Sequence, residues 1–143
     1  MSRTADIDFT FSGPVDVTGF LNLLAGGGVS FSRAGHVSYL LDEDGMFDWS
    51  QAADAALDGI ILEMGDVRRI QGTVGISMIF SESIQGGDLL FQPGRSVVSF
   101  LISINRKNLS GSSKFCDLGW YLDRLVPLLE PLGLIEIEAR DSE

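Results

Sequence analysis

Apolar residues recur at every second position in several short stretches of the chain. Residues 7–12 alternate throughout, and residues 73–81 place Val74, Ile76, Met78 and Phe80 on one face. This is typical of strands that bury one face and leave the other in water. The other predicted strands are 29–32, 36–41, 88–91, 96–104 and 134–139. Only Arg33, Ala34 and Gly35 separate the strands 29–32 and 36–41, so we expect these two to form a hairpin.

Three other stretches carry apolar residues at helical spacing. The first follows Asp16, a residue type that caps helix starts, and stops at the glycines of 26–28. The second is expected to begin at Ser50 and to have Arg68 and Arg69 in its last turn, with a break expected near Gly65. The third begins at Asp117, and Pro127 within it is expected to kink the helix or to end its regular part.

The alternating and helical stretches together predict a single α+β domain over residues 1–143. We expect a mainly antiparallel sheet of six to seven strands, with two or three helices packed on one side. A chain of 143 residues that is 45% apolar has the length and composition for one sizeable core.

The apolar stretches are all short. None approaches the roughly 18 residues that a membrane span requires. The beginning of the chain, MSRTADIDF, has no apolar segment of the kind that signal peptides contain. Cys116, the single cysteine, cannot form an internal disulfide, and we expect it to be a small buried hydrophobic residue. These features predict a cytoplasmic protein.

Acidic residues outnumber basic residues and gather in the first half of the chain. The formal net charge is −10; residues 1–66 contain 11 acids and 2 bases, whereas residues 67–143 contain 9 acids and 8 bases. An acidic field repels nucleic acids and anionic membranes and attracts basic surfaces. We therefore expect a protein partner with a basic surface, and neither nucleic acid nor membrane. Solubility alone is the simpler explanation for the total charge.

The stretch DEDGMFDWSQAAD (42–54) places acids beside aromatic residues. Protein interfaces favour aromatic side chains at the centre and charged side chains at the rim. In an alternative interpretation, the aromatic side chains turn inward and fasten the following helix to the sheet, while the acids face water. The residues that we predict to bind a partner are Asp42, Glu43, Asp44, Phe47, Asp48 and Trp49.

The residue types that catalysis and metal binding require are scarce. An EF-hand loop that started at Asp42 would have Met46 and Phe47 where it needs an acid and a glycine. One histidine, His36, and one cysteine cannot make a zinc site without several carboxylates. The G-x-S-x-G elbow and the G-K-[S/T] phosphate loop do not occur. We predict no catalytic residue, no metal and no cofactor, with a weak divalent-ion site at the acidic loop as an alternative.

Three stretches, VSFLISINRKNL, DLGWYLDRLVPLLEPLGL and MFDWSQA, resemble small bacterial immunity proteins of polymorphic toxin systems. The resemblance spans roughly residues 45–137 and consists of a long strand, a polar loop and a helix with Trp120 and Tyr121. It implies a cytoplasmic, non-enzymatic protein that binds a cognate toxin and blocks it. Such toxins are often nucleases with basic surfaces. The resemblance carries over no individual binding residue.

Two other classes of function stay open. A small metal- or ligand-binding domain, or an enzyme, could use the acidic loop, and stoichiometric binding of divalent ions would identify it. A structural homodimer could form through an exposed sheet edge or through the helix that carries Trp120 and Tyr121. Its mass in dilute solution would identify it.

Overall fold

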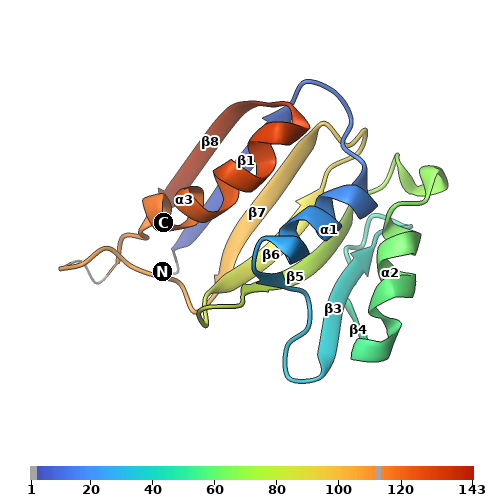
Figure 1. Ribbon diagram of the computed structural model, residues 1–143, viewed down its shortest axis with the longest axis horizontal. Coiled ribbons are helices and arrows are strands. Elements are labelled where there is room, and N and C mark those ends of the chain that lie inside the picture. Colours follow the sequence, from blue (N-terminus) through green and yellow to red (C-terminus); the bar gives the residue numbers. More distant parts are fainter. Residues whose placement is uncertain (1–2, 112–113) are drawn as a thin grey trace.

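An antiparallel sheet with helices on one side makes up the protein, as predicted (Figure 1). The computed structural model describes residues 3–111 and 114–143. Within these ranges no helix is long and apolar enough to cross a membrane. The α-helices in them are α1 (Val17–Gly26), α2 (Leu57–Met64) and α3 (Leu118–Leu129). The strands in them are β1 (Thr4–Phe11), β2 (Val29–Ser30), β3 (His36–Leu41), β4 (Ser50–Ala53), β5 (Val74–Phe80), β6 (Gly86–Phe91), β7 (Val97–Ile104) and β8 (Leu134–Ser142).

The strands follow the order β4-β3-β5-β6-β7-β1-β8, and β2 pairs with β5 beside this path. Strand β1 therefore lies between β7 and β8, which come from the other end of the chain, and Thr4 pairs with Ser142. The N and C labels accordingly lie close together in Figure 1. One edge of the sheet is β4, with four residues, and the other is β8, with nine.

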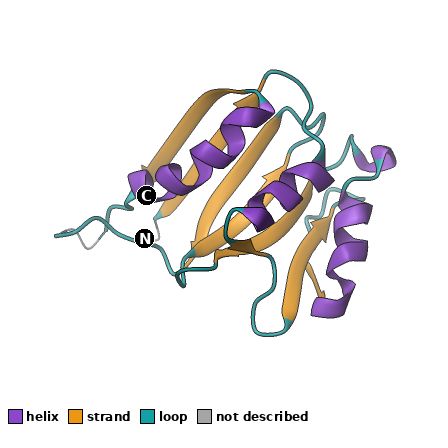
Figure 2. Ribbon diagram, in the orientation of Figure 1, coloured by secondary structure: helices purple, strands orange, loops and turns teal. Residues whose placement is uncertain are grey.

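The apolar positions of the strands form the core beneath the helices. Strand β1 buries Ile7, Phe9 and Phe11, and each of the three helices adds buried residues to the same cluster. Phe20 of α1 meets Phe11 and Phe91 edge-on, with ring centroids 5.9 and 5.0 Å apart. Figure 2 shows α1 and α3 lying across the same side of the sheet. The alternation in the sequence thus corresponds to one covered face and one uncovered face.

The face of the sheet opposite the helices carries no helix from the described ranges, and we call it the open face. Its side chains are mostly polar, with Leu90 and Leu101 among them. One cross-strand row on it consists of Gly75, Leu90, Ser99, Asp8 and Glu138. Further residues that the strand register places on the open face are Asp6, Ser77, Asp88, Leu101, Ser103, Glu136 and Arg140.

Two of the predicted helix starts are confirmed. Asp16 accepts a hydrogen bond from the backbone N–H of Gly19 at 3.2 Å. Asp117 accepts one from the backbone N–H of Trp120, also at 3.2 Å. Pro127 lies inside α3, close to its C-terminal end, so the helix tolerates it for less than one further turn.

The predicted start of the second helix is wrong. Ser50 does not cap a helix, because Ser50–Ala53 forms β4 and pairs with β3. Helix α2 begins only at Leu57, after a 3-10 turn over Asp54–Ala56. Alanine favours helices, but backbone pairing with β3, which leaves no trace in the local pattern, overrides that preference. The extra strand raises the sheet to eight strands.

The predicted hairpin within residues 29–41 is also wrong. Strand β2 pairs with residues 79–80 of β5 rather than with β3. A single bridge between Arg33 and His36 marks the tight turn between β2 and β3. On the edge of β5 that faces away from β6, β3 pairs only with residues 74–76. Strand β2 pairs with residues 79–80 of the same edge.

A buried arginine joins two turns. Arg95 is 3% exposed and has a φ of 66°. Its guanidinium group donates to four backbone carbonyl oxygens at 2.7–3.2 Å. Burial lowers the pKa of Arg95 from its ordinary value, although an arginine remains charged at neutral pH. The acceptors belong to Arg69, Gly72, Phe91 and Gln92.

Asp141 of β8 connects three distant parts of the chain. Its carboxylate accepts the backbone N–H of Cys116 at 2.7 Å and pairs with Arg3 at 3.0 Å. Burial opposes ionisation of this carboxyl group, but the bonds from Cys116 and Arg3 outweigh burial, so the pKa of Asp141 is lowered.

Replacing Asp141 by Asn is expected to lower the free energy of unfolding by about 1.5 kcal/mol at neutral pH, because charge-assisted bonds are lost. A carboxyl group with a lowered folded-state pKa stabilises the fold above about pH 4, and this effect is lost as the pH falls through the folded pKa. The loss caused by Asp141→Asn should therefore be full at pH 6 and smaller at pH 3. Urea denaturation measures it, with exposed Asp123→Asn as the control. A loss that stays constant over this range would contradict the prediction.

Candidate functional site

The loop between β3 and β4 is held in shape by its own carboxylates. One oxygen of Asp42 accepts the backbone N–H groups of Gly45 and Phe47, at 3.0 and 3.2 Å. Asp44 accepts the backbone N–H of Met46 at 3.0 Å. Gly45 and Phe47 have positive φ angles of 81° and 53°, so the chain turns sharply here. Two of the four predicted acids therefore shape the loop.

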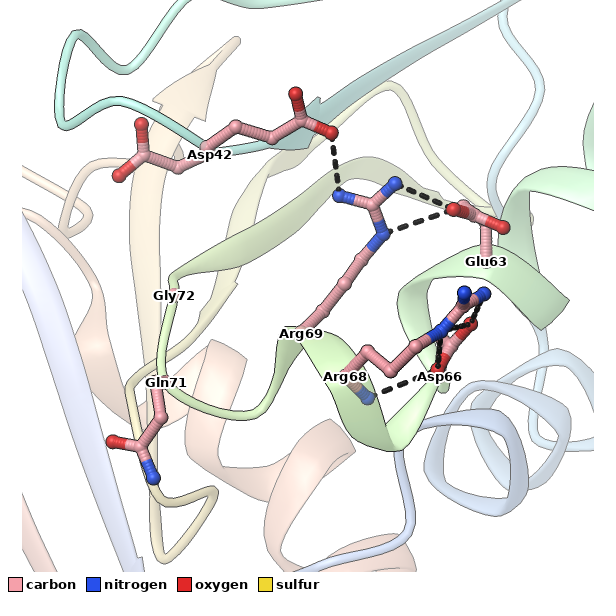
Figure 3. A pocket seen from close by; sticks show the side chains of 8 residues that line it. Asp42, Glu63, Asp66, Arg68, Arg69, Gln71 and Gly72 are labelled. Carbon is pink, nitrogen blue, oxygen red and sulfur yellow. Dashed lines mark hydrogen bonds and ion pairs between the residues drawn. The ribbon is translucent and has the colours of Figure 1, made fainter.

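Arg69 joins this loop to the end of α2 (Figure 3). Its guanidinium group donates to Glu63 of α2 at 3.0 Å and to Glu43 of the loop at 3.0 Å. Hydrogen bonds to Glu63 and Glu43 raise the pKa of Arg69. An exposed ion pair contributes at most about 1 kcal/mol, so the main effect of Arg69 is to position the base of the loop.

A surface groove of about 550 Å³ lies between the loop and the segment that follows α2. Arg68 pairs with Asp66 at 2.6 Å in this groove. Hydrogen bonds from the side chain and backbone of Arg68 lower the pKa of Asp66 to about 2. Acid–arginine pairs thus dominate the groove, which favours a structural role for it. Its lining consists of Asp42, Glu43, Glu63, Asp66, Arg68, Arg69, Gln71 and Gly72.

The three large apolar side chains of the loop remain in contact with water. Met46, Phe47 and Trp49 are 68%, 50% and 40% exposed. Trp49 lies on the open face, where its ring comes within 3.1 Å of the position that a Cβ on Gly75 would take. Helix α2 packs on the opposite face of the sheet. The interpretation in which Trp49 turns inward to fasten α2 is therefore wrong.

The predicted partner-binding residues thus lie in one loop but differ in their surroundings. Asp42 and Asp44 shape the backbone, and Glu43 pairs with Arg69. Asp48 is exposed and has no hydrogen-bond or ion-pair partner among the described residues. Asp48 is therefore the carboxylate of the loop that a partner meets without displacing an existing bond.

No protein-family model, curated protein or solved structure matches this chain. Function is therefore inferred from the chemistry of its own residues.

Groups that could carry out chemistry are dispersed. Within residues 3–111 and 114–143, no group of three or more His, Cys, Asp and Glu side chains is placed to hold a metal ion. Cys116 is buried, as predicted, and burial raises the pKa of its thiol to about 11, so it stays protonated at neutral pH. His36 is exposed at the start of β3.

Sequence reasoning missed the role of Arg69 and the acids of the open face. Arg69 pairs with Glu43, 26 positions away in the sequence, and no local pattern reveals such a pair. The acids of the open face occupy polar positions of strands that alternation predicts. Their common surface follows only when the strand order is known. These acids are Asp6, Asp8, Asp88, Glu136 and Glu138.

Proposed function

We propose that this protein binds and neutralises a cognate toxin with a basic surface, as an immunity protein, and does so without catalysis. One observation carries the proposal: Met46, Phe47 and Trp49 are exposed on a loop that its own carboxylates hold in shape. Large side chains on a preorganised loop lose little conformational entropy on binding and are frequent anchors of protein interfaces. The resemblance to immunity proteins supports the class of partner.

Charge supports a basic partner. Residues 1–66, which include the loop, hold 11 acids and 2 bases, and such a field raises the rate at which a basic surface associates. A nuclease toxin would present a basic site for nucleic acid, and an acidic protein seated there would exclude that substrate. Phe47 and Trp49 would supply the apolar contact, with Asp48 at its rim.

A pull-down from the source cells tests the proposal. The tagged protein is recovered at low and at high salt, and bound proteins are identified by mass spectrometry. We expect one stoichiometric basic protein, lost at high salt because screening weakens exposed charge pairs. Recovery of nothing contradicts the proposal, and recovery of the chain itself alone favours a homodimer instead.

Removing the apolar anchor and reversing the neighbouring charge is expected to weaken binding to this partner about 100-fold. The variant is Asp48→Lys with Trp49→Ala, measured by surface plasmon resonance after circular dichroism has confirmed the fold. Asp42 and Asp44 stay unchanged because their carboxylates shape the loop.

The matched control is Asp58→Lys with Leu62→Ala on α2, where Leu62 is 68% exposed. It makes the same change in charge and also removes an exposed apolar side chain. We expect it to change the affinity less than about threefold. Equal losses in the two variants would mean that net charge, and not the loop, determines binding.

A further inference from the structure

The open face continues the surface of the loop across the sheet. Trp49 lies over Gly75, close to Leu90, at one end of the cross-strand row that ends at Glu138. Four inter-strand steps of about 4.8 Å make this row about 19 Å long. The loop extends this surface beyond the row at its Trp49 end.

The half of the open face that β1 and β8 form is acidic. Arg140 is the one base that the register places on this half within the described ranges, and it pairs with Asp6 and Asp8 at 2.6 Å and also with Glu138. Hydrogen bonding to Asp8, followed by Asp6, raises the pKa of Arg140. Glu136 adds a fourth carboxylate. Arg140 therefore pairs with three carboxylates, and this half of the face holds four carboxylates against one base.

The centre of the open face has short side chains that hydrogen-bond to one another. Asp88 accepts the hydroxyl of Ser77 at 2.6 Å and that of Ser103 at 3.4 Å. Leu101, which is 36% exposed, lies beside Asp88 in the register. Short side chains in fixed positions let a partner approach the sheet closely, so a flat contact needs little rearrangement.

On the basis of the proposed function, we propose that the open face, from Trp49 to β8, is the surface on which a basic protein docks. Trp49 and Leu90 form the apolar end of this surface, and the carboxylates of β1 and β8 form the end that attracts positive charge. A second copy of this chain would bring another net charge of −10 against these carboxylates, and nucleic acid would bring phosphates. Charge complementarity therefore selects a basic protein as the occupant.

A defined basic probe, octalysine, tests where positive charge binds. The ¹⁵N-labelled protein is titrated with octalysine at low salt, and chemical-shift changes are followed by NMR. We expect the largest shifts in the backbone amides of β1, β7 and β8. In the variant Glu136→Lys with Glu138→Lys, the dissociation constant should rise at least about tenfold.

The matched control is Asp123→Lys with Glu130→Lys, which makes the same change in charge at exposed positions on the helix side of the sheet. It should raise the dissociation constant less than about threefold. Equal weakening by both variants, shifts confined to residues 42–49 and the groove beside them, or no binding of octalysine would each overturn the inference.

The partner recovered in the pull-down separates this inference from the proposed function. If no basic partner is recovered while octalysine still binds the open face, the proposed function fails and the docking surface stands. If a basic partner is recovered but hydrogen exchange of β1, β7 and β8 is unchanged in its complex, the proposed function stands and the docking surface is wrong. Slower exchange of these strands in the complex supports both.

Discussion

Replacing Arg95 by Met is expected to lower the free energy of unfolding by about 3 kcal/mol. Arg95 is 3% exposed, and its guanidinium group donates to four backbone carbonyl oxygens. Methionine fills a similar volume but donates no hydrogen bond, so these buried oxygens lose their partners. A buried acceptor left without a donor costs about 1–3 kcal/mol, and part of the sum is recovered because no buried charge remains.

Urea denaturation followed by circular dichroism measures this loss. Arg95→Lys keeps the charge but replaces a planar fork with a single ammonium group, so we expect a loss of similar or slightly smaller size. Exposed Arg68→Met is the control and should change the stability by less than about 0.5 kcal/mol. If Arg95→Met and Arg68→Met behaved alike, Arg95 would not join the two turns.

Replacing Gly87 by Ala is expected to cost about 3 kcal/mol or more. A Cβ at this position would lie 2.0 Å from the backbone carbonyl oxygen of Leu101 and 3.0 Å from the ring of Phe100. The pairing of β6 with β7 shifts register at this point, as at a β-bulge, where strands approach closely. Relief of the clash requires movement of backbone in β7, because the obstructing atom is not the end of a flexible side chain.

Gly59→Ala is the matched control for Gly87→Ala. Gly59 lies inside α2, and a Cβ there would meet no atom within 4 Å. Alanine is the better helix former, so this variant should gain about 0.5–1 kcal/mol. Thermal unfolding of both variants shows whether each substitution raises or lowers the stability. A stable Gly87→Ala protein with unchanged β6–β7 pairing would contradict the close approach.

The sequence predicts most of the fold where local pattern and tertiary structure agree. Apolar and polar residues alternate in β1 and β5 because one face of each strand is buried. Asp16 and Asp117 cap helices through hydrogen bonds to residues only three positions further along the chain. The errors concern pairing between distant segments. Strand β4 has no strand-like pattern and exists because β3 lies beside it, and β2 takes β5 as its partner, although β3 is nearer in sequence.

The candidate site, like the fold, has one part that the local sequence predicts and one part that depends on strand pairing. Composition alone shows that acids surround Phe47 and Trp49 between residues 42 and 54. The position of Trp49 over Gly75 depends on the register of β3, β4 and β5, and glycine is needed at that point because a side chain would collide with the indole and with Leu90. A sequence pattern over a dozen residues therefore cannot predict that Trp49 lies over Gly75.

The position of β1 in the sheet has a consequence for synthesis on the ribosome. Strand β1 emerges first, yet one of its two neighbours, β8, comes from the opposite end of the chain, with Thr4 paired to Ser142. At about 5–20 residues per second, the nascent chain waits roughly 7–28 s between these two strands. During this interval the backbone groups of β1 that later bond to β8 have no strand beside them. The high contact order of this topology makes completion of the sheet a late step, which waits until β8 has left the ribosome.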